Sequence, residues 1–193
     1  MNPWYGKAAF LLGTIVMIAI RAPHGQRSRG VPVAKSRKGA LETALLTGAW
    51  LGFLLPFLWL ATPWLEVADY PLRPPALASG VALLAGGLWI FHRSHADLGT
   101  NWSISLEVRE GHRLVTGGIY RRIRHPMYLG LLLHSAGLAA AVPNWIAGPS
   151  YLATFVPLLA LRLRPEERMM REEFGAEYET YAARTNRLLP GIW

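Results

Sequence analysis

A chain of 193 residues is long enough for one domain, and a composition of 52% hydrophobic and 17% charged residues is that of a membrane protein rather than a soluble one. The absence of cysteine excludes a disulfide framework, a thiol nucleophile and a cysteine-based metal site. The formal net charge of +8 raises nucleic acid as a partner, but the basic residues are distributed along the chain as in a membrane protein.

Five apolar segments approach the length that crosses a hydrocarbon core of about 30 Å. The first is expected to be retained as a helix, because its basic residues follow the apolar run instead of preceding it as in a cleavable signal. Pro56 is expected to kink the second segment. Pro143 and Asn144 predict a turn between the last two, which would form a tight helical hairpin. The five segments are 4–20, 40–60, 76–91, 127–142 and 145–161.

The residues after the last apolar segment, 162–187, mix charged side chains with aromatic ones. Met170, Phe174, Tyr178 and Tyr181 recur at helical spacing, which predicts an amphipathic helix whose aromatic stripe packs against the polar loop. We therefore predict an all-α integral membrane protein with about five transmembrane helices, a C-terminal amphipathic helix and a polar loop on the cytoplasmic side.

The basic residues predict the orientation. Of the 20 Lys and Arg residues, six lie in each of the stretches 21–38, 92–125 and 162–187. Five spans would place all three stretches on one face, which the positive-inside rule assigns to the cytoplasm, with the N-terminus outside and the C-terminus inside. The stretch 21–38 is expected to form a basic loop and is interpreted as a topology signal attracted to anionic lipid, with a substrate-binding role as the alternative.

The stretch GHRLVTGGIYRRIRHPMYLG connects a polar loop to the fourth apolar segment at Pro126. Proline at the first helical position loses nothing, because that N–H would be unpaired anyway. The proline ring disfavours helical geometry at His125, so His125 is expected at the mouth of the helix. The backbone N–H groups of Met127 and Tyr128 then favour an anion such as a carboxylate or phosphate.

An antiparallel hairpin would also bring His125 next to Arg162, although the two are 37 positions apart. Arg162 and Glu166 are spaced to share one helical face, and an arginine at the end of a membrane helix needs anionic partners. From spacing alone, a structural ion pair and a functional site both remain open. His92 and His95 lie one helical turn apart but lack a third ligand at helical spacing, so a metal site is not expected.

HRLVTGGIYRRIRHPMYLG followed by RLRPEERMMREEFGAEYETYAART resembles the isoprenylcysteine carboxyl methyltransferase family and its prokaryotic relatives, which are integral membrane enzymes that use S-adenosylmethionine. The combination of His-x-Leu-Val, Gly-x-Tyr, Arg-His-Pro-x-Tyr and Arg-x-x-x-Glu-Glu carries the resemblance, which covers 95–193. It implies an S-adenosylmethionine-dependent methyltransferase in the membrane that modifies a lipid-like or prenylated acceptor at a carboxylate. The expected organisation is one domain, 1–193, with three spans in 1–92 and the cofactor-binding catalytic half in 93–193.

The resemblance also implies residue roles. Arg162 would meet the carboxylate of the substrate, and Glu166 the amino group of the cofactor. Arg162 and His125 are the implied catalytic residues. No role is carried over to Ser105, where eukaryotic members have glutamine, and participation of Glu167 or His134 stays open. The implied cofactor-binding residues are His112, Arg113, Leu114, Val115, Tyr120, His125, Pro126, Met127, Tyr128 and Glu166.

The chemistry fits these residue types. Methyl transfer from a sulfonium is an in-line displacement, which needs the nucleophile held about 3–3.5 Å from the methyl carbon. A carboxylate is already a nucleophile at neutral pH and requires no base. A lipid-like acceptor would enter sideways between helices, where Gly80, Gly86, Gly87 and Pro56 leave a gap, unless these glycines serve close packing.

Other functions remain open. A phospholipid amine N-methyltransferase would need a base, with His125 or Glu167 as the candidates. A sterol-reductase-like membrane reductase would bind NADPH, and a non-catalytic scaffold would bind neither cofactor. The expected partners are membrane lipid and a lipophilic or lipidated acceptor, without nucleic acid or metal.

Overall fold

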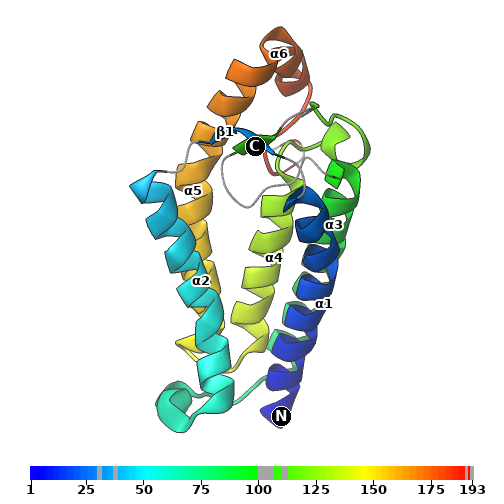
Figure 1. The fold of residues 1–193 in the computed structure, drawn as a ribbon. Coiled ribbons are helices and arrows are strands. Elements are labelled where there is room, and N and C mark those ends of the chain that lie inside the picture. Colours follow the sequence, from blue (N-terminus) through cyan, green and yellow to red (C-terminus); the bar gives the residue numbers. More distant parts are fainter. Residues whose placement is uncertain (30–31, 37–38, 100–106, 110–112, 190, 192–193) are drawn as a thin grey trace.

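The computed structural model describes residues 1–29, 32–36, 39–99, 107–109, 113–189 and 191. Helices α1 to α5 run side by side as a bundle, with the N-terminus at one end and α6 at the other (Figure 1). The α-helices in the described part of the chain are α1 (Trp4–Arg29), α2 (Ala40–Ala61), α3 (Pro74–Leu98), α4 (Pro126–Ala141), α5 (Ala147–Phe174) and α6 (Ala176–Ala183). Two 3-10 helices, η1 (Pro63–Ala68) and η3 (Gly118–Arg121), lie in the connections.

The prediction of a helical integral membrane protein is confirmed, with one addition. Strand β1 (Val33–Ser36) pairs antiparallel with strand β2 (Glu107–Arg109) at the same end of the bundle as α6 (Figure 1). This pair connects two polar segments that are far apart in the sequence. A pairing between strands of four and three residues has too few residues for an alternating pattern to reveal it.

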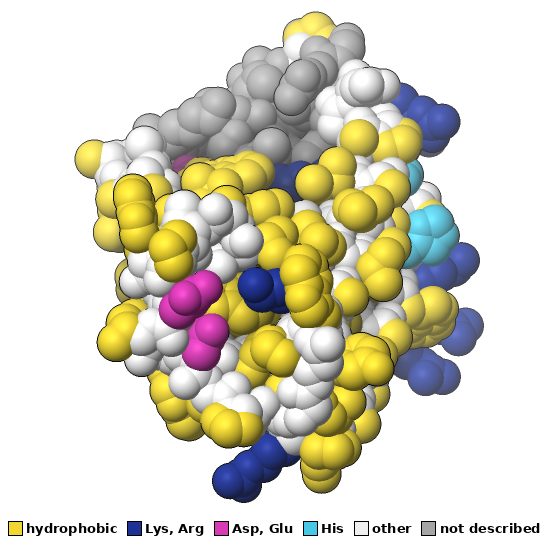
Figure 2. All heavy atoms as spheres, turned by 90° about the horizontal axis from the view of Figure 1, so that it is seen from below, with side chains coloured by type: hydrophobic (Ala, Val, Ile, Leu, Met, Phe, Trp, Pro, Cys, Tyr) yellow, Lys and Arg dark blue, Asp and Glu magenta, His cyan; other side chains and the backbone are white. Residues whose placement is uncertain are grey.

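Helices α1, α2 and α3 are long and apolar enough to cross a membrane, whereas α4 is a shorter apolar helix. Large apolar side chains such as Leu12, Ile15 and Trp89 are exposed on the outside of the bundle, as suits contact with lipid. Hydrophobic side chains are also widespread on the face at the N-terminal end, with a few charged side chains among them (Figure 2). The exact number of spans, expected to be five, remains a prediction.

Three helices extend further than their apolar segments predict. Helix α1 continues to Arg29, so 21–29 is helical and not part of a loop, and α3 continues to Leu98. Helix α5 continues to Phe174, so the predicted tail helix is instead the end of α5 followed by α6. The physical reason is that a helix leaving the membrane has no need to end where its apolar residues do. Helix α5 ends at Gly175, whose φ of 51° favours glycine.

Helices α3 and α4 pack backbone to backbone. A Cβ atom placed on Gly87 would lie 2.7 Å from the carbonyl oxygen of Gly130, and one placed on Gly137 would lie 2.8 Å from the backbone nitrogen of Leu84. Small residues at helix interfaces permit this close approach in membranes. Gly80 packs in the same way against Ala141. Gly80 and Gly87 therefore serve close packing, and they do not open the gap considered for acceptor entry.

The predicted hairpin turn between α4 and α5 is confirmed. Asn144 Oδ1 accepts hydrogen bonds from the backbone N–H groups of Ile146 at 3.0 Å and Ala147 at 2.7 Å, where α5 begins. The Asn144 side-chain amide donates to Asp69 Oδ1 at 2.6 Å and so fixes the turn to the connection between α2 and α3. The turn directs α5 back along α4, toward the end where α4 began.

The bend before α4 is held by the C-terminal segment. The backbone N–H of Arg124 donates to the carbonyl of Asn186 at 2.8 Å, and that of His125 donates to the carbonyl of Arg187 at 3.0 Å. His125 has φ −123° and ψ 55°, which is outside helical geometry as predicted, and α4 begins at Pro126. The segment after α6 therefore fixes His125 at the mouth of α4.

Candidate functional site

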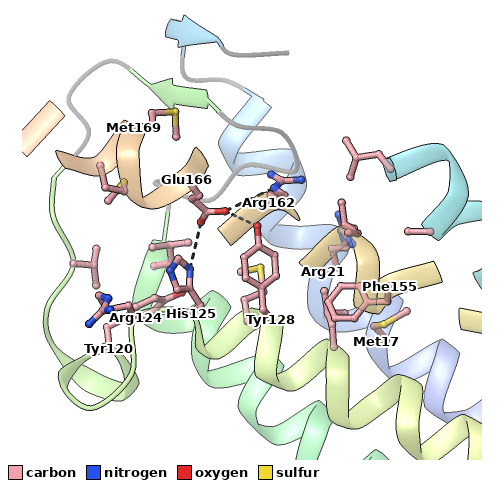
Figure 3. A pocket seen from close by; sticks show the side chains of 18 of the residues that line it. Met17, Arg21, Tyr120, Arg124, His125, Tyr128, Phe155, Arg162, Glu166 and Met169 are labelled. Atoms are coloured by element: carbon pink, nitrogen blue, oxygen red, sulfur yellow. Dashed lines mark hydrogen bonds and ion pairs between the residues drawn. The ribbon is translucent and has the colours of Figure 1, made fainter. Parts of the chain in front are cut away.

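A cavity of about 220 Å³ lies where this bend, α5 and the inner parts of α1 and α2 come together. One side is polar and includes Tyr120, His125 and Glu166. The other side is apolar and includes Phe53 of α2 and Phe155 of α5. The labelled polar side chains are spread across the cavity, from Tyr120 on one side to Arg162 and Arg21 on the other (Figure 3).

Glu166 is at the centre of the polar side. Its Oε1 lies 3.7 Å from His125 Nδ1, and its Oε2 lies 3.7 Å from Arg162 Nε and accepts a hydrogen bond from the Tyr128 hydroxyl (Figure 3). The rings of His125 and Tyr128 stack with centroids 5.6 Å apart. The predicted proximity of His125 and Arg162 is confirmed, because both lie beside the same carboxylate.

The neighbouring Glu167 has different surroundings. Arg124 Nε donates to Glu167 Oε1 at 2.9 Å, and Arg187 Nη2 lies 3.0 Å from Oε2. His125 Nε2 lies 3.6 Å from Glu167 Oε1, which is too far for an ordinary hydrogen bond but close enough for a charge interaction. Arg124 also donates to the backbone carbonyl oxygens of Ala182, at 3.0 Å, and Thr185. Glu167 therefore joins the bend to the C-terminal segment.

The two carboxylates determine the charge of His125. Burial alone would lower the pKa of His125, but the adjacent Glu166 and Glu167 raise it above its ordinary value. Burial would likewise raise the pKa of Glu166, and His125, Arg162 and Tyr128 instead lower it. Burial would raise the pKa of Glu167 too, but the nearby His125 and the hydrogen bonds from Arg187 and Arg124 hold it well below its usual range. His125 is therefore stabilised as a cation between two carboxylates.

Arg162 is buried between two acids on different helices. Its Nη1 lies 3.6 Å from Glu42 Oε1 of α2, and its Nε lies 3.7 Å from Glu166 Oε2. Only 7% of the Arg162 side chain is exposed, so the guanidinium is held in place by charge and packing together. Glu42 was not predicted as a site residue; its only signal in the sequence is an acid in the first turn of an apolar helix.

Most of the predicted site residues are brought together. Those that line the cavity are Arg113, Leu114, Val115, Tyr120, His125, Met127, Tyr128, Arg162 and Glu166. Pro126 is buried at the start of α4 and is not among the lining residues. His112 and Ser105 lie outside the described residues. Glu167 and His134 do not line the cavity, and within the described ranges no group of three or more His, Cys, Asp or Glu side chains could hold a metal ion.

Lining residues from α1, α2 and the apolar part of α5 were not predicted from the sequence. Met17 and Arg21 come from α1, and Leu46, Trp50 and Phe53 come from α2, in the half of the chain without a recognisable motif. Met170, Tyr178 and Tyr181 were predicted as packing residues, and they also line the cavity. The α1 residues follow a helical stripe of buried positions, which could have revealed them.

Comparison with known proteins places this geometry in context. A family model described as phospholipid methyltransferase matches residues 75–177. A probable protein-S-isoprenylcysteine O-methyltransferase from Oryza sativa subsp. indica is 33% identical over 89 residues, covering 46% of this chain and 47% of the relative. The human protein-S-isoprenylcysteine O-methyltransferase is 31% identical over 116 residues, covering 59% of this chain and 41% of the relative. The resemblance to the isoprenylcysteine carboxyl methyltransferase family is confirmed.

A solved structure has a related fold. It is that of a eukaryotic intramembrane Ras methyltransferase, isoprenylcysteine carboxyl methyltransferase, with a TM-score of 0.54 and 23% identity. The match covers 81% of this chain and 54% of the other. The matched part of this chain spans under half the length of the two curated relatives above.

Proposed function

Since the chain belongs to the phospholipid methyltransferase family, we propose that it is a membrane enzyme that transfers a methyl group from S-adenosylmethionine to the carboxylate of a lipid-like or prenylated acceptor. The observation that carries the proposal is the cavity itself. Glu166, half-buried and in contact with several polar side chains, lies on its polar side, and apolar side chains of α2 and α5 form the other side. Such a site suits one polar and one lipophilic reactant.

The polar side fits the proposed methyl donor. The Glu166 carboxylate lines the cavity, and its lowered pKa keeps it ionised to receive an ammonium group. The backbone and side chains of Arg113, Leu114 and Val115 form the wall on which the rest of the donor would lie. The donor supplies an electrophilic methyl group on a sulfonium. The protein residues bind and orient the reactants and exclude water from a partly apolar site.

The charge of His125 favours a carboxylate acceptor over an amine. An amine must lose a proton before it attacks, and a histidine whose pKa is raised is a poor base at neutral pH. Glu167, the other candidate base, is surrounded by Arg124, Arg187 and His125 and is not among the residues that line the cavity. A carboxylate needs no base, so the residues present are sufficient for O-methylation. N-methylation of a phospholipid amine remains the second candidate, because the family model carries that description.

We further propose that the whole chain acts as one unit with its site on the cytoplasmic face. The cavity is lined from both halves of the chain, by Met17 and Phe53 as well as by His125 and Glu166. The basic ends of α1 and α5 lie at the same end of the bundle as the site (Figure 1). The positive-inside rule assigns that end to the cytoplasm.

Binding and transfer measured on the purified protein in detergent test the proposal. We expect calorimetry to detect S-adenosylhomocysteine binding and no binding of NADPH. Labelled methyl groups should be transferred to N-acetyl-S-farnesylcysteine and not to phosphatidylethanolamine. Binding of NADPH alone would indicate a reductase, and transfer to the amine alone would indicate the N-methyltransferase.

The role of Arg162 is tested by Arg162→Ala with Arg164→Ala as its control, because Arg164 is an exposed arginine on the same helix. We expect Arg162→Ala to lower turnover by roughly tenfold to a hundredfold, the scale of a lost charge-assisted hydrogen bond, while S-adenosylhomocysteine still binds. Arg164→Ala should behave as the wild type. Loss of cofactor affinity with unchanged turnover at saturation would assign Arg162 to the donor instead.

A further inference from the structure

Among the described side chains of α1, Arg21 is the one that brings a charge to the cavity wall. The buried side chains of Phe10, Thr14 and Met17 recur at helical spacing along one face of α1, and Arg21 continues this face. The guanidinium of Arg21 consequently points into the cavity, beside Phe155 and Met17 (Figure 3). Arg27, two turns further along the same helix, is exposed.

Arg21 and Arg162 approach the cavity from opposite helices. Both line it, and their charges repel each other. Glu42 and Glu166 hold Arg162 on its own side, and Tyr151 of α5 lies near Arg21. Two guanidinium groups facing one partly apolar space favour an anion between them, because each can donate two parallel hydrogen bonds to a carboxylate.

The cavity wall also includes a residue that is exposed on the outside of the bundle. Helices α1 and α2 touch in their outer halves, where the rings of Phe10 and Phe57 meet edge to face with centroids 4.7 Å apart. In their inner halves Met17 of α1 and Trp50 of α2 line the cavity instead. Trp50 is 52% exposed, so the cavity wall at this point continues into the surface of the bundle that faces lipid.

We propose that Arg21 is a substrate-binding residue that holds the anionic group of a lipid-like acceptor together with Arg162, while the apolar chain of the acceptor leaves the cavity between the inner halves of α1 and α2. The inference rests on the proposed function for the identity of the acceptor. Arg21 thereby selects acceptors with a carboxylate at the end of a lipid chain, and it places that carboxylate between α1 and α5. The basic stretch after the first span, predicted to be a topology signal, thus also contributes to the site.

The test compares N-acetyl-S-farnesylcysteine with its carboxamide, which has the same shape without the charge. Binding of each is measured with and without S-adenosylhomocysteine. The wild type should bind the carboxylate at least about tenfold more tightly than the carboxamide, as expected when charge-assisted hydrogen bonds are lost. Arg21→Gln should remove most of that preference and leave S-adenosylhomocysteine affinity within about twofold, since Glu166 and the 113–115 wall are unchanged.

Two further variants separate binding from folding. Arg21→Lys keeps the positive charge but not the planar guanidinium that donates two parallel hydrogen bonds. It should retain part of the preference for the carboxylate over the carboxamide. Arg27→Gln removes an exposed charge from the same helix and should match the wild type. Equal binding of carboxylate and carboxamide by the wild type, no acceptor binding at all, or an unchanged preference in Arg21→Gln would each overturn the assignment. A chain that prefers the carboxylate but binds no S-adenosylhomocysteine would keep Arg21 as an anion site and remove the methyltransferase proposal.

Discussion

The two sides of α4 are built in opposite ways. Toward α3, Gly130 and Gly137 bring the backbones so close that a Cβ atom has no room. Toward α1, α2 and α5, Tyr128 and Leu131 face a cavity. The same helix therefore closes one side of the bundle and leaves the other open to ligands. Close packing on one side provides the rigid support that a binding site needs on the other.

The adjacent residues Glu166 and Glu167 repeat this division. Glu167 is buried among Arg124, Arg187 and His125 and joins the bend to the C-terminal segment, whereas Glu166 faces the cavity. One carboxylate stabilises the structure, and the other is available to a ligand. Variants that affect only one side should separate stability from binding.

The largest expected effect is on the closed side, at Glu167. Glu167→Gln would leave Arg124 and Arg187 without their shared carboxylate, and removing one partner of a buried ion pair costs about 3–5 kcal/mol. We expect thermal unfolding in detergent to shift strongly downward. Glu172→Gln, at an exposed position on the same helix, is the control and should leave the unfolding temperature nearly unchanged.

The second-largest effect on stability is expected at the contact between α3 and α4. In Gly87→Ala the new Cβ would lie 2.7 Å from both the Gly130 oxygen and the His134 nitrogen, so the helices must separate, at about 1–3 kcal/mol. Gly86→Ala is a matched control, because a Cβ there has nothing within 4 Å. Unfolding temperatures of the two variants should differ clearly. Equal values would show that the contact is not close.

The smallest effect concerns pH. Because the pKa of His125 is raised in the folded protein, its contribution to stability is full below its ordinary pKa of about 6.5 and is lost as pH rises through the folded value. We expect the wild type to lose stability over that rise. His125→Asn should lack this component. A wild type that gains stability over the same range would contradict the charged state of His125.

The sequence was sufficient to predict that the bend before α4 and the Arg162–Glu166 pair of α5 lie close together on the polar side of the cavity. Its signals are local: a proline that excludes His125 from the helix, and an i, i+4 pair formed by Arg162 and Glu166. The proximity of His125 to Arg162 and Glu166 followed from the hairpin turn at Asn144, which directs α5 back along α4. The site residues that were not predicted come from helices far away in the sequence, and local patterns do not show where such helices pack. Arg21 was placed in a loop because charge was taken as the end of α1, although helix geometry continues its buried face.

Glu42 and the strand pairing illustrate the same limit. The contact of Glu42 with Arg162 joins α2 to α5, and no spacing rule links two residues so far apart. The pairing of β1 with β2 involves segments too short to show a period. The placement of His112, implied by the resemblance, lies outside the described residues and stays a prediction.

The central claim is that the open side of α4 binds a cationic methyl donor through Glu166. Calorimetry of S-adenosylhomocysteine binding to the wild type, Glu166→Gln and Glu172→Gln tests it most directly. We expect roughly tenfold to a hundredfold weaker binding for Glu166→Gln, as expected when a charged hydrogen-bond partner is lost, and no change in affinity for Glu172→Gln. Full affinity in a folded Glu166→Gln protein would contradict it.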